Sequence, residues 1–149
     1  MAKEELVKML NQALGLEHQA MIQYLSHAEL VEGPNAEPII ARLQEIADDE
    51  RRHAEQFRKL IGGYLDGVPS MGVAKAHPAK TLKEILEINL TDEKEAVDFY
   101  TKILDKVKDM KDELKYEYLQ LEYTIRHIIH DEQEHISELK LFKILSGQK

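Results

Sequence analysis

The sequence predicts an all-α protein, a four-helix bundle, from three observations. Apolar residues recur with the period of amphipathic helices over four long stretches. The breaks between these stretches contain glycines and prolines, which end helices. Each stretch also carries a glutamate in line with its apolar residues. Because the four stretches account for nearly all of the 149 residues, we predict a single domain over residues 1–149.

The first two stretches predict a helical hairpin. Apolar residues mark one face of a helix from about Glu4 to about Glu32, and the Gly-Pro-Asn sequence at 33–35 ends it. Pro38 suits the first turn of a second helix, which we expect to reach about Ile61. Because the link is short, the two helices should be antiparallel neighbours.

The second half predicts another hairpin, reached by a long crossover. Residues 62–80 hold four glycines and two prolines, so we expect them to cross the outside of the bundle between helices two and three. Thr81 and Glu84 have the spacing of a capping box, which opens the third helix. A polar segment at 108–112 predicts the next turn, and the fourth helix should run to about Leu145.

A glutamate and a histidine three residues apart occur twice, as Glu50 with His53 and as Glu132 with His135. At this spacing both side chains project from one face of a helix and can bind the same ion. Such pairs are common on solvated helix faces, but both of these interrupt an apolar stripe. We therefore expect both pairs to face the core.

The other two helices each offer a glutamate and a tyrosine on the apolar face. Glu17 lies on the stripe of the first helix, and Glu93 lies on that of the third, whereas Glu95 falls among polar positions. Tyr24 follows Glu17 by seven residues, and Tyr100 follows Glu93 in the same way. Either phenol could hydrogen-bond a ligand carboxylate or supply an electron, and we include Tyr24 among the catalytic candidates; an ordinary core tyrosine is the alternative.

The four glutamates and two histidines on the apolar faces form a set that predicts a two-metal centre. Its members are Glu17, Glu50, His53, Glu93, Glu132 and His135. Four buried carboxylates require compensating positive charge, which two divalent ions supply. Carboxylate and imidazole donors suit iron or manganese. One glutamate from each of two helices and a Glu-x-x-His pair from each of the others is the ligand pattern of di-metal four-helix bundles.

Composition excludes several other classes. The net charge of −8 and the lack of a basic face argue against nucleic-acid binding. Without cysteine the chain forms no disulfide, zinc–thiolate site, iron–sulfur cluster or rubredoxin-type centre. No apolar run has the length of a membrane span, and the first residues lack the apolar core of a signal peptide, so we expect a cytoplasmic protein without membrane partners.

Three segments resemble the ferritin-like di-iron superfamily, and bacterioferritin most closely. They are residues 16–24 (LEHQAMIQY), 49–55 (DERRHAE) and 64–69 (YLDGVP). The resemblance implies a ferritin-like bundle in which Glu50 and Glu132 bridge two iron ions, with manganese or zinc as substitutes. It implies that the other four residues of the set are terminal ligands. It also implies ferroxidase activity, in which Fe(II) is oxidised by O2 or H2O2 for iron storage or detoxification.

The sequence departs from the bacterioferritin pattern at three places. Arg51 stands where that family has the haem-binding methionine, so we predict no haem. Little sequence follows His135, which leaves no room for the short fifth helix of many cage ferritins. The interval from Glu93 to Glu132 is longer than that from Glu17 to Glu50. We expect a homo-oligomer, a dimer at least, with a cage as the larger alternative.

Two other functions stay open. A peroxide or oxygen reductase resembling the erythrin part of rubrerythrin would keep its metals fixed, although that family's extra carboxylate would fall at Ala96. A helical interaction module with a vestigial site is the third reading. The remaining histidines are predicted to lie at the surface, with transient metal capture as an alternative: His18, His27, His77, His127 and His130. Asp48 and Asp49 could attract Fe(II) or form a solvated face.

Overall fold

The computed structural model describes residues 2–147 and confirms the all-α prediction, with no β-strand in that range. Four long helices form the bundle: α1 (Ala2–Ala28), α2 (Ala36–Lys59), α3 (Leu82–Asp109) and α5 (Tyr118–Leu145). Three short elements complete it: a π-helical turn (Leu60–Tyr64), α4 (Lys111–Leu114) and a 3-10 turn (Lys115–Glu117). None of the helices in the described range is long and apolar enough to span a bilayer.

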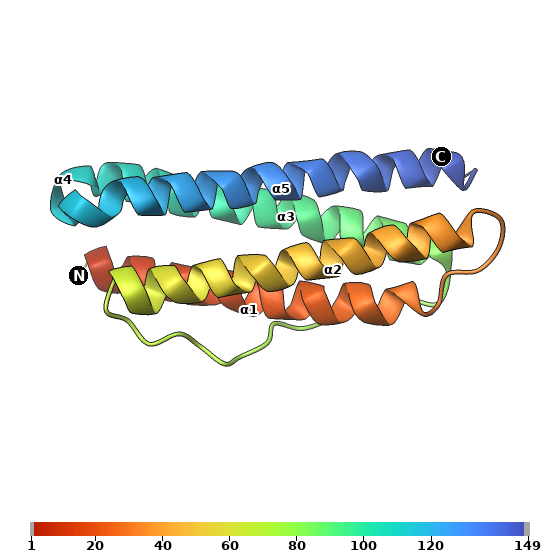
Figure 1. Ribbon diagram of the computed structural model, residues 1–149, viewed down its shortest axis with the longest axis horizontal. Helices are drawn as coiled ribbons and strands as arrows, with labels where there is room; N and C mark the ends of the chain where they lie inside the picture. Colours follow the sequence, from red (N-terminus) through yellow and green to blue (C-terminus); the bar gives the residue numbers. More distant parts are fainter. Residues whose placement is uncertain (1, 148–149) are drawn as a thin grey trace.

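The helices pair as two antiparallel hairpins, α1 with α2 and α3 with α5 (Figure 1). The end of α2 and the start of α3 lie at opposite ends of the bundle, so the crossover runs along the outside of α1 for most of its length (Figure 1). This is the predicted arrangement. It makes α2 and α3 parallel, and it places the two Glu-x-x-His helices, α2 and α5, in different hairpins.

The helix ends follow local sequence signals. Gly33 and Asn35 adopt left-handed conformations, with φ of 97° and 67°, in the turn between α1 and α2. Thr81 caps α3, because its side-chain oxygen accepts a hydrogen bond from the backbone N–H of Glu84 at 3.1 Å. The capping-box prediction is therefore confirmed for this contact.

Three boundaries differ from the prediction, and the first is the end of α1, which stops at Ala28 and not at about Glu32. After α2 the chain continues through the π-helical turn, past Ile61, and the N–H of Leu65 reaches back to the carbonyl of Leu60. The fourth long helix begins only at Tyr118, because α4 and the 3-10 turn come first and Lys115 between them takes a φ of 53°. The longer interval from Glu93 to Glu132 is thus taken up by the part of α3 after Glu93, which is longer than the part of α1 after Glu17, and by this two-part turn.

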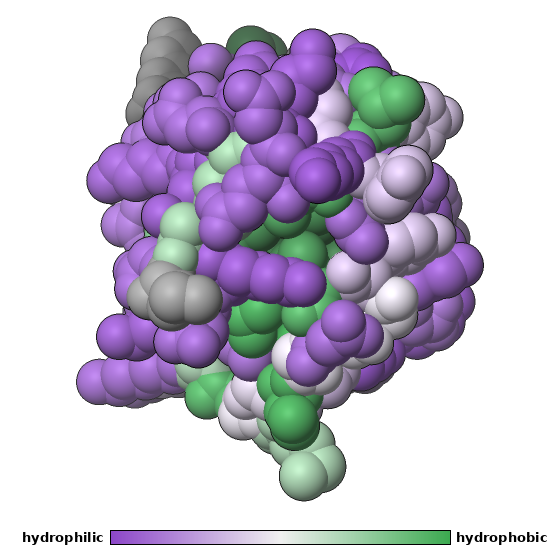
Figure 2. All heavy atoms as spheres, turned by 90° about the vertical axis from the view of Figure 1, so that its left-hand side faces the viewer, coloured by the Kyte–Doolittle hydropathy of each residue, from purple (hydrophilic) through white to green (hydrophobic). Residues whose placement is uncertain are grey.

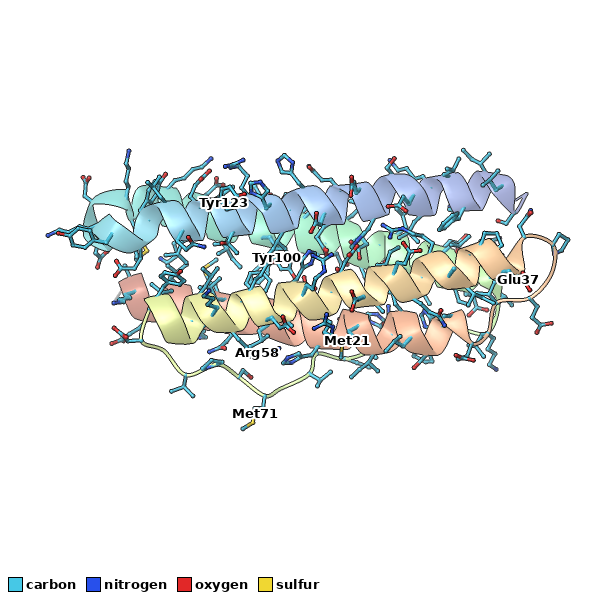
Figure 3. The ribbon with its side chains drawn as sticks, in the orientation of Figure 1. Met21, Glu37, Arg58, Met71, Tyr100 and Tyr123 are labelled. Carbon is cyan, nitrogen blue, oxygen red and sulfur yellow. The ribbon has the colours of Figure 1, made fainter. Side chains whose placement is uncertain are left out.

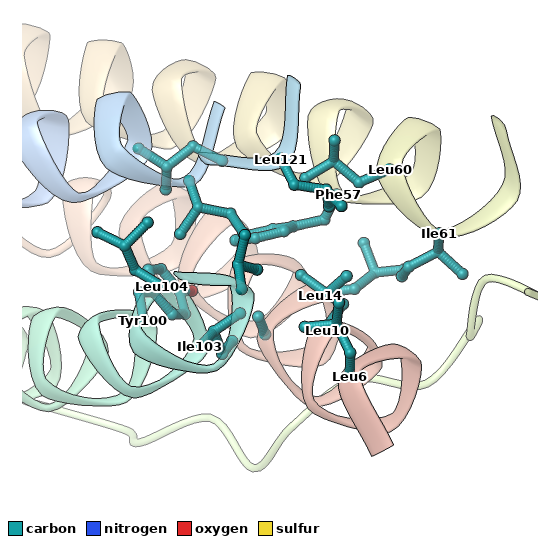
Figure 4. Packing of buried hydrophobic residues seen from close by; sticks show 14 of the residues in the cluster. Leu6, Leu10, Leu14, Phe57, Leu60, Ile61, Tyr100, Ile103, Leu104 and Leu121 are labelled. Atoms are coloured by element: carbon teal, nitrogen blue, oxygen red, sulfur yellow. The ribbon is translucent and has the colours of Figure 1, made fainter. Parts of the chain in front are cut away.

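Two apolar clusters fill the bundle. The first includes Leu10, Phe57, Ile103 and Leu121, all fully buried, and Figure 4 shows it packed between the hairpins. The second lies toward the other end of the helices, and Leu43 is one of its fully buried members. At the end of the bundle seen in Figure 2, apolar side chains are visible within a largely hydrophilic surface. The interval between the clusters holds the buried charged residues.

The crossover has no regular structure after residue 65, but α1 holds it at several points. Asn11 binds it on both sides, since its side chain donates to the carbonyl of Val68 and accepts from the N–H of Ser70. The N–H of Ala74 donates to the carbonyl of Gly15. Met71 projects away from the bundle and is 95 % exposed (Figure 3). The crossover is therefore a strap fastened along α1.

Candidate metal centre

All six predicted ligand residues lie together in the middle of the bundle. They come from the four long helices: Glu17 from α1, Glu50 and His53 from α2, Glu93 from α3, and Glu132 and His135 from α5. Each is at most 3 % exposed. The periodicity argument that favoured Glu93 over Glu95 agrees with this placement, since Glu95 is exposed.

Ligand atoms of these residues form two groups of four. Glu17, Glu50, His53 and Glu132 make one group, and Glu50, Glu93, Glu132 and His135 make the other. Within each group the ligand atoms lie within 4.8 Å of one another. Because Glu50 and Glu132 belong to both groups, these two carboxylates could contribute to the binding of two neighbouring ions.

Both histidines turn the same ring nitrogen toward the carboxylates. Nδ1 of His53 lies 3.2 Å from oxygens of both Glu50 and Glu132. Nδ1 of His135 lies 3.2 Å from an oxygen of Glu93 and 3.5 Å from one of Glu132. The Nδ1 atoms are thus placed as metal ligands, which leaves each Nε2 directed outward.

An aspartate from the opposite hairpin binds each outward nitrogen. Nε2 of His53 donates to Asp131 at 2.7 Å, and Nε2 of His135 donates to Asp49 at 2.9 Å. Such partners fix the tautomer and orientation of metal-binding histidines and increase their basicity. Sequence reasoning did not identify Asp131 and interpreted Asp49 as a cation attractant or solvated residue. The available signal was that each of the two shared glutamates, Glu50 and Glu132, is directly preceded by an aspartate.

The two predicted tyrosines also bind across the hairpins. The hydroxyl of Tyr24 donates to Glu93 at 3.0 Å, and that of Tyr100 donates to Glu17 at 2.7 Å. Figure 3 shows Tyr100 in the space between the hairpins. Burial and the nearby carboxylates raise the pKa of both phenols well above the usual value, so both remain protonated donors.

The carboxylates perturb one another strongly because they are buried together. Burial raises the pKa of Glu17 to about 7 and that of Glu93 to about 8, and the charge of Glu132 adds to both shifts. Burial and its charged neighbours also raise the pKa of Glu50. Burial alone would raise the pKa of Glu132, but the neighbouring imidazoles of His135 and His53 outweigh it and lower that pKa. Negative charge therefore concentrates on Glu132.

The metal-free centre leaves polar atoms unsatisfied. Four buried atoms have no hydrogen-bond partner: Oε2 of Glu17, Oε1 of Glu50, Nδ1 of His53 and Oε1 of Glu132. A buried polar atom without a partner is costly, and buried carboxylates are normally paired or bound to metal. These orphaned atoms lie within the two ligand groups, so the donor set fits a pair of cations.

Comparison with known protein families gives a match to the ferritin-like domain over residues 7–143. The chain belongs to the ferritin-like domain family. All six clustered residues fall inside the matched range. The predicted resemblance to the ferritin-like di-iron superfamily is confirmed.

Individual relatives agree with the family assignment. This ferritin-like chain is 28 % identical to the bacterioferritin of Mycobacterium leprae (strain TN) over 145 residues, covering 97 % of this chain and 87 % of that protein. Among solved structures, a ferritin-like di-iron carboxylate protein from Bacillus anthracis str. Ames matches with a TM-score of 0.87 and 25 % identity, covering 95 % of this chain and 97 % of the other.

Two further structures share the fold at the same identity. The bacterioferritin of Desulfovibrio desulfuricans matches with a TM-score of 0.81 and 25 % identity, over 95 % of this chain and 79 % of that one. A dodecameric thioferritin from Bacteroides fragilis, described as bacterioferritin-related, matches with a TM-score of 0.82 and 25 % identity, over 97 % and 88 % of the two chains. In both comparisons the match covers more than three quarters of each of the two chains.

A cavity of about 360 Å³ leads from the centre of this ferritin-like domain toward the strap. Its lining includes Glu50 and Glu132 at the centre, and Asp92, Glu95 and His77 away from it. The cavity therefore joins the buried carboxylates to the surface on the α1–α3 side of the bundle.

Buried amides brace the wall of this cavity. Gln23 donates to an oxygen of Asp92 at 2.8 Å and accepts from the backbone N–H of His77 at 2.7 Å. Asn89 accepts from Gln23 at 2.9 Å. The network was not predicted, because it depends on the path of the strap.

One of the five histidines predicted at the surface is buried, and this prediction was wrong. His27 is 3 % exposed, its Nε2–H donates to the carbonyl of His77, and its Nδ1 accepts from Asn89. Burial lowers the pKa of His27. Helix periodicity alone does not reveal that the strap covers this part of α1. His18 is half-buried, whereas His77, His127 and His130 are exposed as predicted.

Proposed function

We propose that this ferritin-like protein binds two iron ions and oxidises Fe(II) with O2 or H2O2, in iron storage or detoxification. The observation that carries the proposal is the pair of four-residue ligand groups sharing Glu50 and Glu132. Carboxylate and imidazole donors favour iron or manganese among the common metals, with zinc as a substitute.

The chemistry needs little from the protein beyond binding, charge and access. Two Fe(II) ions lose one electron each, and together they reduce one H2O2 to two hydroxides. Four carboxylates balance the charge of two divalent ions, so binding replaces the protons that the metal-free centre holds. Tyr24 and Tyr100 hold carboxylates in place through their hydroxyls, and the cavity between α1 and α3 offers a path for the oxidant.

The residue at the position of the haem-binding methionine of bacterioferritin supports a haem-free protein. Arg51 is exposed and pairs with Asp48 at 3.0 Å and with Glu55, so a cation stands at the position of the haem-binding methionine. A guanidinium does not ligate haem iron as a thioether does. We infer that the di-iron pair is the metal complement of the centre.

Stopped-flow absorbance tests the proposal. Metal-free protein loaded anaerobically with two Fe(II) per chain is mixed with O2 or H2O2, and formation of ferric product is followed. We expect rapid oxidation that is lost in Glu50→Ala and in Glu132→Ala, while Glu113→Ala behaves as the wild type because Glu113 is exposed on α4, away from the centre and its cavity. Circular dichroism verifies that the variants remain helical. Equal rates for the wild type and the Glu50 variant would refute the assignment.

The native mass of the protein distinguishes an iron-storage assembly from an enzyme that keeps a fixed metal pair. We propose a homo-oligomer, supported by the dodecameric assembly of the related thioferritin. Light scattering on a sizing column measures the mass directly. A closed assembly of a dozen or more chains encloses a cavity for mineral, whereas a dimer together with sustained peroxide turnover from an external reductant would favour a rubrerythrin-like reductase.

A further inference from the structure

An exposed stripe on α5 carries residues that the centre does not use. Tyr123, His127, His130 and Glu134 follow one another at spacings of four, three and four, which places them on one face of the helix. All four are exposed. Figure 3 marks Tyr123 on α5, well separated from Tyr100 between the hairpins.

His127 is held in a conformation that suits a metal ligand. Its Nδ1–H donates to the backbone carbonyl of Tyr123 at 2.8 Å. Its ring stacks on that of Tyr123 with centroids 3.9 Å apart. A histidine whose Nδ1–H binds a carbonyl has its lone pair on Nε2, the usual arrangement of metal-binding imidazoles. The Nε2 of His127 is therefore available.

His130 lies one turn further along the same face. Its ring centroid is 6.0 Å from that of His127, and the two ring planes are 21° apart. Within residues 2–147 neither ring nitrogen of His130 has a hydrogen-bond partner, and Glu134 has no ion-pair partner in that range. This distinguishes the pair from His18, whose two ring nitrogens contact Gly72 and Arg58.

We propose that His127, His130 and Glu134 bind a divalent transition-metal ion on the outer face of α5. Two imidazole nitrogens and one carboxylate are a donor set that suits iron or zinc. The histidines have the i, i+3 spacing of the Glu-x-x-His pairs at the centre, and Glu134 follows His130 by one turn. His127, His130 and Glu134 are not among the groups whose ligand atoms lie within 4.8 Å of one another in residues 2–147. The proposed site therefore requires His130 to rotate about its side-chain torsions until one of its ring nitrogens converges with Nε2 of His127.

The charges near the stripe favour a cation. Arg126 is the neighbouring base, but its guanidinium pairs with Glu122 at 2.7 Å. Asp131 follows His127 by one helical turn, is 40 % exposed, and accepts the hydrogen bond from His53 of the centre. The outer site therefore lies next to a carboxylate that contacts a predicted ligand of the buried centre. That its ion is Fe(II) moving toward the centre rests on the proposed function.

Zinc binding tests the site without reference to oxidation. Zn²⁺ is titrated by calorimetry into metal-free full-length wild type, into the double variant His127→Asn/His130→Asn, and into Lys140→Asn as a control that changes another exposed residue of α5. We expect the double variant to lose one zinc per chain and to keep the zinc bound at the centre, while the control binds as the wild type does. Equal stoichiometry in wild type and double variant overturns the site, as does an equal loss in the control.

Oxidation rates at varied Fe(II) concentration test the role of the ion. We expect the double variant to need several-fold more Fe(II) for half-maximal rate, with an unchanged maximal rate. If zinc is lost but this concentration is unchanged, the site stands and delivery of Fe(II) is refuted. If the wild type binds zinc on α5 but does not oxidise Fe(II), the proposed function fails while the outer site stands.

Discussion

The substitution Asp131→Asn tests the negative charge of Asp131 apart from the hydrogen bond that its side chain accepts. Asp131 accepts from Nε2 of His53 at 2.7 Å, and an asparagine oxygen can accept the same bond at nearly the same place. The substitution therefore leaves His53 oriented but removes the negative charge that increases the basicity of its Nδ1. Only one of the two ligand groups contains His53, so we expect one of the two metal-binding steps to weaken.

The size of the effect follows from the exposure of Asp131. Removing such a partner typically weakens metal binding 10- to 100-fold, or about 1.4–2.7 kcal/mol. Asp131 is 40 % exposed, and water screens its charge. We therefore expect the lower end, about tenfold. Asp49 is 20 % exposed, but Arg52 and Arg42 already share its charge, so Asp49→Asn should weaken the other step by a similar factor.

Competition between the protein and a chelator for Co²⁺ measures the two steps, since cobalt reports its coordination by absorbance. Asp48→Asn is the matched control, because Asp48 is 59 % exposed and pairs with Arg51 on the solvent side of α2, the helix that carries His53 and Asp49. Unchanged binding in Asp131→Asn, or an equal loss in Asp48→Asn, would refute the argument that the aspartates act through the histidines.

Three further predictions concern stability. Phe57→Ala should cost about 3–5 kcal/mol of unfolding free energy in denaturant titrations, because Phe57 is fully buried, whereas Leu119→Ala at a 72 % exposed position should change it by less than about 0.5 kcal/mol. Gly67→Ala should cost about 1–3 kcal/mol, since an added Cβ would lie 2.8 Å from a valine methyl of α1, while Gly63→Ala meets nothing closer than 3.6 Å and should be tolerated. Because the pKa of Glu17 is raised to about 7 from 4.5, the folded metal-free protein keeps a proton that the unfolded chain loses. Its melting temperature should therefore fall as pH rises from about 5 to about 7, an effect reduced by bound metal, and a rise instead would contradict the pKa direction.

The parts of the fold that could be predicted are those fixed by local sequence. The apolar period predicted four helices, and the Thr81 cap and the Gly-Pro-Asn break at 33–35 follow from backbone chemistry within a few residues. The six clustered residues could be predicted because a carboxylate on an apolar stripe must face the interior. These inferences need only the position of a side chain around its own helix.

What could not be predicted depends on which helices face one another. The hydrogen bond from Nε2 of His53 to Asp131 joins residues 78 positions apart, and nothing in either helix alone identifies its partner. His27 is buried because the irregular crossover segment covers it. The late start of α5 follows from the positive φ of Lys115, and lysine is not a residue type that predicts a positive φ.

The cross-hairpin contacts at the centre couple metal binding to the cohesion of the molecule. Each four-residue group takes three residues from one hairpin and one from the other, and the aspartates and tyrosines reach across in the same sense. Neither hairpin alone completes a binding site. Metal loading should therefore slow the separation of the two hairpins from each other, while fraying at the ends of each helix stays as fast as before.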